Sequence, residues 1–524
     1  MSRAARARGV TLSLWQGLFA ACAEEMGVTL MRAAHSPNIK ERLDHSCAIF
    51  DAQGRLVAQA AHIPVHLGSM PRAVQAARAL APFAPGDTVI VNDPYAGGTH
   101  LPDITLVTPV FFTPRGAPEF YVASRAHHAD VGGAAPGSMP LAREVFEEGV
   151  RLPPVRLVRA GRWAEDVLAL LLANVRTPDE RRADLAAQLG AQVTGARRLQ
   201  AYAAREGVAR VTAAAAALIA HGARVARVAV ARLPRGRWRF ADALDDDGLG
   251  TGPIPIVATV TLDGRRVRVD FAGSSPQVHG PVNAVEAVTF AASAYAVRLL
   301  LGELPVNAGT FSVLDVRAPL GTVVNARFPA AVSAGNVETS QRIVDTVLGA
   351  LARACPDRVP AASAGTMNNL LVGGMDPRTG RPFAYYETLG GGHGAGPGWD
   401  GEHAMQVHMT NTRNTPIEAL EHAVPLRVEG MRIRRGSGGR GRWRGGDGIE
   451  RRLRALVPVR VTVMSDRRAR GPYGLAGGRP GAPGFAKVTG RTGRTRTLAG
   501  KCQVDLPAGA VLTLASPGGG GYGR

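Results

Sequence analysis

The chain has 524 residues, of which 45% are apolar, and its mean hydropathy is −0.01. This length and composition are typical of a globular protein with a large core and two to four domains, and they exclude a disordered or membrane-embedded chain. The net charge of +20 would suit a nucleic acid or an anionic membrane as partner. Because the charge is carried almost wholly by arginine in a chain rich in alanine and glycine, we attribute it to compositional bias and expect neither partner.

The N-terminal region combines arginines with an apolar run, as a secretory signal does. The apolar side chains from Trp15 to Leu30 nevertheless follow helical spacing, and Glu24 and Glu25 continue the polar face. The four cysteines show no CxxC spacing, which is typical of a reducing compartment. We therefore expect an amphipathic N-terminal helix and a cytoplasmic protein. No other apolar run is expected to approach the roughly 18 residues that span a bilayer.

The next elements lead to a central loop. Residues 48–59 are predicted to form a hairpin around the turn at 51–54. A helix is expected after Ser69, with this serine as N-cap and Pro71 in the first turn. A short strand is predicted at 88–91.

The stretch from residue 91 to 133 contains the most informative pattern in the chain. Two apolar runs, 104–112 and 120–126, have the length and the β-branched or aromatic content of buried strands. If they pair as an antiparallel hairpin, the start of the first lies beside the end of the second. The groups that then meet at one rim are Asp93, His100, Asp103 and one histidine of the pair His127 and His128.

Two imidazoles and two carboxylates in a glycine-containing loop suit a divalent transition metal such as Mn, Zn or Fe. For any one of these residues alone, a turn cap or an ordinary hydrogen bond is the better explanation. The set favours a metal, because seven of the 13 histidines lie before residue 129. His62 and His66 are candidates for further ligands, but we expect them to be hydrogen-bonded loop histidines.

Beyond residue 160 the expected elements are helices and then strands. Residues 163–231 are predicted to form two or three helices, with a break near Pro178. A hairpin is predicted over 254–271, because Asp263 and Gly264 separate two β-rich runs. Further helices are expected at 284–301 and from the segment 335–342.

The stretch 35–47 is too polar for a core and too irregular for an amphipathic helix. Three further stretches, 335–342, 390–394 and 408–416, are dense in amide and hydroxyl side chains and glycine. Loops of this kind often surround a small polar substrate, although ordinary turns explain each of the three equally well. The candidate substrate-binding residues are Asn38, Lys40, Glu41, Arg42, Glu338, Gln341, His393, Asn411 and Asn414.

The tail from residue 427 onward is basic, glycine-rich and β-like, with strands expected at 451–456 and 459–464. Residues 436–441 match GxGxxG, but no helix pattern follows, so a dinucleotide site is not expected. An RNA-binding RGG segment is the other interpretation, and the neighbouring strands favour an ordered domain instead.

Together these elements predict an α+β protein that is multi-lobed, with mixed sheets, helical segments and a β-rich, glycine-rich C-terminal region. We expect four regions: an N-terminal α/β region with the metal loop (1–160), a helical region (161–235), an α/β substrate region (236–425) and the β-rich C-terminal region (426–524).

Eight blocks of sequence resemble the hydantoinase B/oxoprolinase family, and they run through essentially the whole chain. They are SPNIKERLDHSCAIFD (36–51), HLGSM (66–70), NDPYAGGTHLPD (92–103), HHADVGG (127–133), GNVETSQRI (335–343), HMTNTRNTPIEALE (408–421), GSGGRGRWRGGD (436–447) and SPGGGGYG (516–523). This family includes the B-type subunits of N-methylhydantoinases, part of 5-oxoprolinase and the related subunit of acetone carboxylase.

The resemblance implies an amidohydrolase that opens a cyclic amide at the expense of ATP. In that scheme a hydantoinase A-type partner holds ATP in an actin-like site and phosphorylates the substrate's carbonyl oxygen, and the B-type subunit handles the activated intermediate. The chain itself contains no GxxxxGK[ST] phosphate loop. The manganese ligands of the acetone carboxylase relative fall here on His100, Asp103 and one of His127 and His128, and Asp93 is our addition.

Phosphorylation turns the carbonyl oxygen into a leaving group, and a metal lowers the pKa of bound water toward neutrality. His128 and Asp130 are candidate catalytic residues that would orient the ligands or shuttle the proton. Two alternatives stay open. One is a subunit of an ATP-dependent carboxylase that acts on a ketone at the same metal, and the other is a non-catalytic basic scaffold or nucleic-acid-binding protein.

Overall fold

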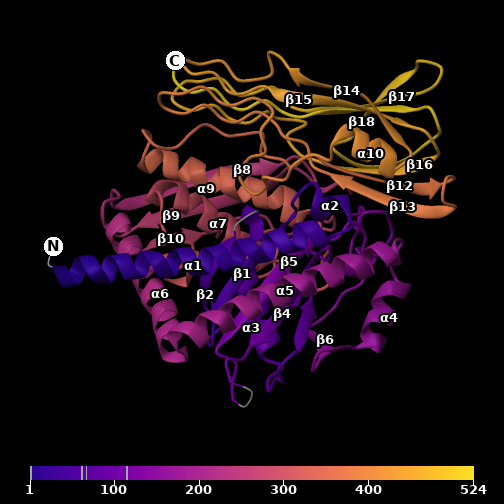
Figure 1. Ribbon diagram of the computed structural model, residues 1–524. Helices are drawn as coiled ribbons and strands as arrows, with labels where there is room; N and C mark the ends of the chain where they lie inside the picture. The colour runs from indigo at the N-terminus through magenta and orange to yellow at the C-terminus, as the bar shows by residue number, and fades with distance from the viewer. Residues whose placement is uncertain (1–2, 61–62, 67, 114–115) are drawn as a thin grey trace.

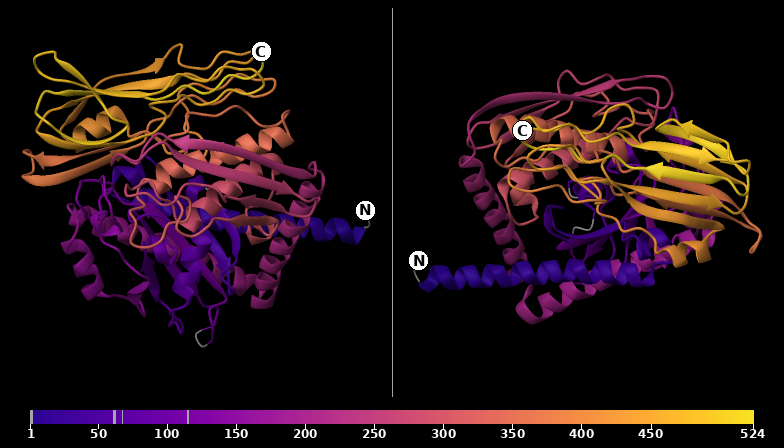
Figure 2. Two further views of the ribbon diagram at one scale, coloured as in Figure 1. Left: turned by 180° about the vertical axis from the view of Figure 1, so that it is seen from behind. Right: turned by 90° about the horizontal axis from the view of Figure 1, so that it is seen from above.

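The computed structural model describes residues 3–60, 63–66, 68–113 and 116–524. Four β-sheets and the helices packed on them make up this part of the chain, which confirms the α+β class (Figure 1). The N-terminal sheet lies at one end of the molecule and the C-terminal sheets lie at the other, as the two further views also show (Figure 2).

The N-terminal sheet has seven strands in the order β2-β1-β5-β4-β3-β6-β7, and every neighbouring pair is antiparallel. The strands are β1 (His45–Asp51), β2 (Leu56–Ala60), β3 (Thr88–Val91), β4 (Asp103–Val110), β5 (Phe120–His127), β6 (Val155–Arg159) and β7 (Arg162–Trp163). The hairpin expected at 48–59 and the strand expected at 88–91 are confirmed.

Helices cover both faces of this sheet. Along β5, Phe120 and Val122 pack with side chains of α1 (Arg3–Ala33) and α5 (Pro178–Glu206), whereas Tyr121 and Ala123 pack with α3 (Met70–Arg78) on the other face. This two-residue alternation is the pleat of a strand buried on both sides. The amphipathic N-terminal helix is confirmed, since Trp15, Phe19, Cys22, Met26 and Leu30 at helical spacing are buried. Ser69 does precede α3, but its hydroxyl bonds the Val65 carbonyl instead of capping the helix.

Three helices follow the sheet, as expected: α4 (Glu165–Ala173), α5, which begins at Pro178, and α6 (Val208–Ala231). Among the described helices, α6 is the one long and apolar enough to cross a membrane, with a mean hydropathy of 1.4 over its most apolar window. The expectation that no further run would approach that length is therefore wrong, because alanines make α6 apolar between its arginines. In the fold, α6 packs against α1, α5 and α8 (Ala308–Phe311), and 39% of that window is buried.

A second sheet, in the order β11-β10-β9-β8, packs against two helices in the middle of the molecule. Its strands are β8 (Gly236–Leu244), β9 (Ile254–Leu262), β10 (Val267–Asp270) and β11 (Leu314–Arg317), and the helices are α7 (Glu286–Leu301) and α9 (Ser340–Ala354). The hairpin expected over 254–271 is confirmed, as are both helices. A π-helical turn, η4 (Gly335–Thr339), leads directly into α9.

The C-terminal part is a sandwich of two sheets, ordered β13-β12-β16-β19 and β14-β15-β20-β17-β18. The strands are β12 (Asn369–Asp376), β13 (Arg381–Glu387), β14 (Leu426–Arg434), β15 (Gly448–Ala455), β16 (Val459–Met464), β17 (Phe485–Thr489), β18 (Thr495–Leu498), β19 (Lys501–Leu506) and β20 (Val511–Ala515), with α10 (Ile417–Ala423) beside them. One apolar cluster fills the space between the sheets, as in other sandwiches. The strands expected at 451–456 and 459–464 are confirmed.

Glycine-rich segments lie side by side next to this sandwich. The Gly519 amide donates to the Gly446 carbonyl at 2.9 Å, and the Gly439 amide donates to the Gly519 carbonyl at 2.8 Å. A Cβ atom on Gly438 or Gly445 would collide with a carbonyl oxygen of the neighbouring segment. The GxGxxG pattern therefore serves close packing of backbone against backbone and does not open a nucleotide-binding helix.

A buried network of charges joins the middle sheet to the sandwich. Arg342 of α9 contacts Asp242 of β8 at 3.1 Å and Asp466, which follows β16, at 2.7 Å. The Lys501 ammonium lies 2.7 Å from the second oxygen of Asp466, and Arg467 contacts Asp242 at 2.7 Å. Every one of these cations therefore has an aspartate partner.

Candidate metal centre

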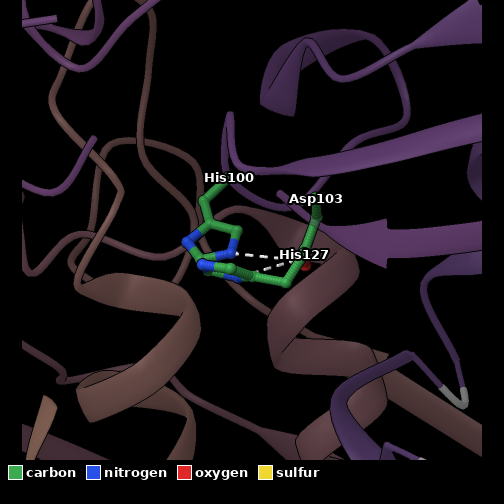
Figure 3. A group of neighbouring side chains, drawn as sticks. All are labelled: His100, Asp103 and His127. Carbon is green, nitrogen blue, oxygen red and sulfur yellow. Dashed lines mark ion pairs between the residues drawn. The ribbon is translucent and has the colours of Figure 1, made fainter. Parts of the chain in front are cut away.

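β4 begins at Asp103 and β5 ends at His127. The antiparallel pairing of the two strands therefore places these residues opposite each other. This confirms the expected hairpin. His100 lies on the loop that leads into β4, three residues before Asp103. The side chains of His100, Asp103 and His127 point toward one another (Figure 3).

The three side chains form a compact group. His100 Nε2 lies 3.1 Å and His127 Nδ1 lies 3.3 Å from the same oxygen, Oδ1 of Asp103. One ligand atom from each residue lies within 4.8 Å of the others, and all three residues are buried. Two imidazole nitrogens and one carboxylate oxygen at this separation are a ligand set that suits a divalent transition metal with further positions open.

The surroundings of His100 fit a cation. Its Nδ1 bonds the Ser333 carbonyl at 3.0 Å, and since a carbonyl only accepts, the Nδ1 carries the proton. In the neutral ring, the Nε2 lone pair then faces a carboxylate oxygen, and this contact is repulsive unless a positive charge lies between the two atoms. Burial lowers the pKa of His100, but the Asp103 carboxylate outweighs it and the pKa is raised overall. Such a carbonyl on the far nitrogen is the usual support of a histidine ligand.

A third histidine, His66, also reaches Asp103. Its Nε2 lies 3.5 Å from Oδ2, and its Nδ1 bonds the Ser46 hydroxyl at 3.0 Å. We expected His66 to be a hydrogen-bonded loop histidine and did not include it in the centre. The HLGSM block, which begins at this residue, was the signal in the sequence that could have identified it. His62 lies outside the described residues.

Two more polar side chains bind Oδ2 of Asp103. The Thr99 hydroxyl donates to it at 2.8 Å, and the Asn336 Nδ2 donates to it at 3.2 Å. Burial alone would raise the pKa of Asp103, but the histidines and their hydrogen bonds hold it well below its usual value. Asp103 is therefore ionised, and its Oδ1 is the oxygen that faces His100 and His127.

The other predicted ligand and the two candidate catalytic residues lie outside this group. Asp93 caps the short helix η2 (Pro94–Ala96) by accepting from the Tyr95 amide, and Arg151 lies 3.1 Å from it. The His128 Nε2 bonds Gln188, and burial lowers the pKa of His128 to about 4. Asp130 accepts from the amides of Gly132, Gly137 and Arg176 and from the Arg176 guanidinium, so it shapes its own loop.

Some of the candidate substrate-binding residues gather behind His127. The Tyr386 ring stacks on the His127 ring with centroids 4.5 Å apart, and the Arg42 guanidinium lies 4.6 Å from the Tyr386 centroid. Arg42 is fully buried and donates to Asn38 Oδ1 and to the Tyr386 carbonyl. Asn414 reaches the same region, since it donates to the Thr388 carbonyl next to these groups.

The remaining candidates are spread more widely. Glu338 accepts from Asn369, and Gln341 donates to the Val407 carbonyl, both in buried positions of η4 and α9. Lys40 and Asn411 are exposed, and Glu41 is half-buried. His393 stacks on Trp399 beside the glycine-rich segments.

Two buried carboxyl groups near the centre have pKa values close to neutrality. Burial raises the pKa of Asp44 to about 6, and Asp103 and His66 both act on it electrostatically. Burial also raises the pKa of Glu148 to about 7. Glu148 accepts from the amides of Val332 and Ser333, so it holds the segment whose carbonyl binds His100.

Comparison with solved structures gives two close likenesses. The ATP-dependent caprolactamase of Pseudomonas jessenii superposes with a TM-score of 0.90 at 29% identity, covering 98% of this chain and 91% of that chain. An acetone carboxylase in its nucleotide-free form superposes with a TM-score of 0.91 at 19% identity, covering 98% and 76%, and at that identity it shows the fold alone.

Comparison of sequences gives the family. An uncharacterized protein of Methanocaldococcus jannaschii is 40% identical over 96% of this chain and 88% of its own length. The 5-oxoprolinase 1 of Arabidopsis thaliana is 39% identical over 98% of this chain, which spans only 42% of that protein. A putative B-type component of a D-/L-hydantoinase from a Pseudomonas species is 30% identical over 98% of this chain and 90% of its own length. The model of the hydantoinase B/oxoprolinase family matches residues 8–524, and the chain therefore belongs to that family.

Proposed function

We propose that this chain is the B-type subunit of an ATP-coupled cyclic amidase and hydrolyses a phosphorylated cyclic amide at a divalent metal. The observation that carries the proposal is the group of His100, Asp103 and His127 in a chain of this family. The names of the relatives, an oxoprolinase, a hydantoinase component and a caprolactamase, share the opening of a cyclic amide. A hydantoinase A-type partner would supply ATP and the phosphorylation step.

The residues of the chain suit such a reaction. His100, Asp103 and His127 would hold Mn, Zn or Fe, and the metal would lower the pKa of a water ligand for attack on the activated carbon. Asp44, with a pKa of about 6, is suited to accept a proton near neutral pH. Arg42 and Arg125 are fully buried cations in the same region, and they favour an anionic phosphorylated ligand. We place the reaction in the cytoplasm, since the four cysteines are unpaired and ATP is consumed.

Metal content tests the first half of the proposal. We expect about one Mn, Zn or Fe ion per chain in protein from metal-replete cells, and we expect His100→Ala to lose most of it. The matched control is His279→Ala, which removes an exposed histidine and should retain the metal. A wild-type protein with none of these metals, or a His100→Ala protein with the full content, would contradict the proposed centre.

Reconstitution tests the second half. The chain alone should not hydrolyse hydantoin, 5-oxoproline or caprolactam, and addition of an A-type subunit with ATP should start hydrolysis of a cyclic amide. Turnover of a ketone with bicarbonate in the same mixture would establish the carboxylase alternative. Salt-dependent DNA binding without either activity would establish the scaffold alternative.

A further inference from the structure

The π-helical turn η4 places one asparagine against the metal centre. Asn336 is only 3% exposed, and its Nδ2 donates to Asp103 Oδ2 at 3.2 Å. An ionised carboxylate has no hydrogen to donate, so the amide nitrogen must be the atom that faces Asp103. The other end of the same amide, Oδ1, is buried and has no hydrogen-bond partner.

An unpartnered acceptor in this position needs an explanation. A buried amide oxygen without a hydrogen bond is destabilising, and most buried polar atoms therefore have partners. The same segment carries three more buried polar atoms without a partner, Ser333 Oγ, Glu338 Oε2 and Gln341 Oε1. Of these three residues, Ser333 adjoins the centre, since its carbonyl bonds His100 Nδ1. A π-helical turn such as η4 is frequent at functional sites.

We propose that Asn336 selects substrates by their ring N–H group: its Oδ1 accepts a hydrogen bond from the nitrogen of the cyclic amide while its Nδ2 holds Asp103. This proposal rests on the cyclic amidase function proposed above and names the feature of the substrate that the centre recognises. Phosphorylation of the carbonyl oxygen draws the nitrogen lone pair into a C=N bond and leaves the ring hydrogen on a cationic N–H. This N–H is a donor, and Oδ1 can only accept, so the two groups are complementary. A ketone or an N-alkylated cyclic amide lacks this hydrogen and would leave Oδ1 unpaired.

Recognition of this kind discriminates strongly. A buried site that hydrogen-bonds an N–H or O–H group rejects an analogue without it by up to about 10⁴–10⁵-fold, because the polar atom of the site is left without a partner. Asn336 does not titrate, so its contribution is orientation and selection and involves no proton transfer. A water molecule on the metal is the other possible donor to Oδ1, and it would bind there with any substrate.

The test compares a cyclic amide with its N-methyl analogue in the reconstituted enzyme with metal, A-type subunit and ATP. Caprolactam and N-methylcaprolactam are a suitable pair. We expect the wild type to prefer the N–H compound by at least about 100-fold in kcat/KM. Asn336→Leu should lose most of that preference, because loss of the Oδ1 acceptor slows the N–H compound, whereas loss of the Nδ2 bond to Asp103 acts on both compounds alike. Asn336→Ala provides a second variant should leucine disturb folding, and exposed Asn174→Leu is the control that keeps the preference.

Equal slowing of both compounds by Asn336→Leu would overturn the proposal, since it would assign the residue to Asp103 or to water. A wild type that hydrolyses no cyclic amide would instead contradict the proposed function. In that case calorimetry with the metal-loaded chain decides the role of Asn336. Selective binding of caprolactam over N-methylcaprolactam that Asn336→Leu abolishes supports the proposal, and equal binding of the two compounds overturns it.

Discussion

Two buried clusters of charged and titratable residues, about the same size, are built in opposite ways. At the candidate metal centre, His66, His100 and His127 lie around the carboxylate of Asp103. In the network between the middle sheet and the sandwich, the aspartates are matched by permanent cations, as Asp466 is by Arg342 and Lys501. The first cluster contains the nitrogen and oxygen atoms that would hold the proposed metal, whereas the second already contains its cations.

The two clusters bury charge for different purposes. Arginine and lysine beside an aspartate satisfy it with hydrogen bonds and a full charge, and they leave no position for a metal. A histidine nitrogen beside an aspartate satisfies it only when that nitrogen carries a proton or when a metal ion lies between the two atoms. A buried cluster rich in histidine is therefore the one to examine for chemistry, and a cluster rich in arginine holds parts of the fold together.

The largest expected effect follows from Asp103→Asn, which breaks the first cluster. Asparagine preserves the volume and removes the ligand charge, so turnover should fall by more than the roughly 10- to 100-fold typical of outer-shell changes. The fold should survive. Steady-state rates of the reconstituted enzyme, with metal analysis and circular dichroism, check this outcome. Full activity in Asp103→Asn would show that the centre lies elsewhere.

A substitution in the second cluster should lower the free energy of unfolding. Asp466→Asn leaves Arg342 and Lys501 buried without their shared partner, and removal of one member of a buried pair costs about 3–5 kcal/mol in the free energy of unfolding. Denaturant unfolding measures it. The matched control is Asp505→Asn, which removes the exposed partner of Arg460 and should cost at most about 1 kcal/mol. Equal costs for the two variants would refute the assigned role of the network.

The pH dependence of stability sharpens the same contrast. Burial raises the pKa of Asp466, but Lys501 and Arg342 outweigh burial and hold it below its usual value. The unfolded chain therefore binds the proton more readily, so this contribution is fully present above about pH 4 and is lost as the pH falls through the folded pKa. Urea unfolding of the wild type and Asp466→Asn should show a stability gap that narrows below about pH 4. A gap that stays constant with pH would disprove this linkage.

The smallest effect is expected on the arginine-rich helical surface. Arg227 is exposed on α6, and Arg227→Glu should change the free energy of unfolding by less than about 0.5 kcal/mol and leave turnover unchanged. Other exposed arginines between residues 197 and 232 should behave alike. Loss of activity on such a reversal, with the fold intact, would identify this face as the docking surface of the A-type partner.

Much of the fold was predictable because its signals are local. The hairpin of β4 and β5, the break before α5 and the strands β15 and β16 follow from apolar runs and turn residues within short windows. The approach of Asp103 to the end of β5 was predictable for the same reason, since antiparallel pairing of two adjacent strands fixes which of their ends meet. For α6 the apolar pattern was underestimated, because alanine is weakly apolar residue by residue and becomes significant only over a whole helix.

Many of the elements, the family and the approach of Asp103 to a histidine of β5 were predictable from the sequence, because each depends on neighbours along the chain or on whole blocks of residues. The distant groups that complete the candidate site follow from the tertiary structure alone. Asn336 is 233 residues from Asp103, and no short-range pattern reports such a contact. In the structure Asp93 caps a helix and Asp130 is bonded within its own loop. Neither carboxylate reaches the centre, because nearby amides and arginines already bind it. Packing of separate sheets and helices sets these long-range contacts, and periodicity in one segment carries no information about them.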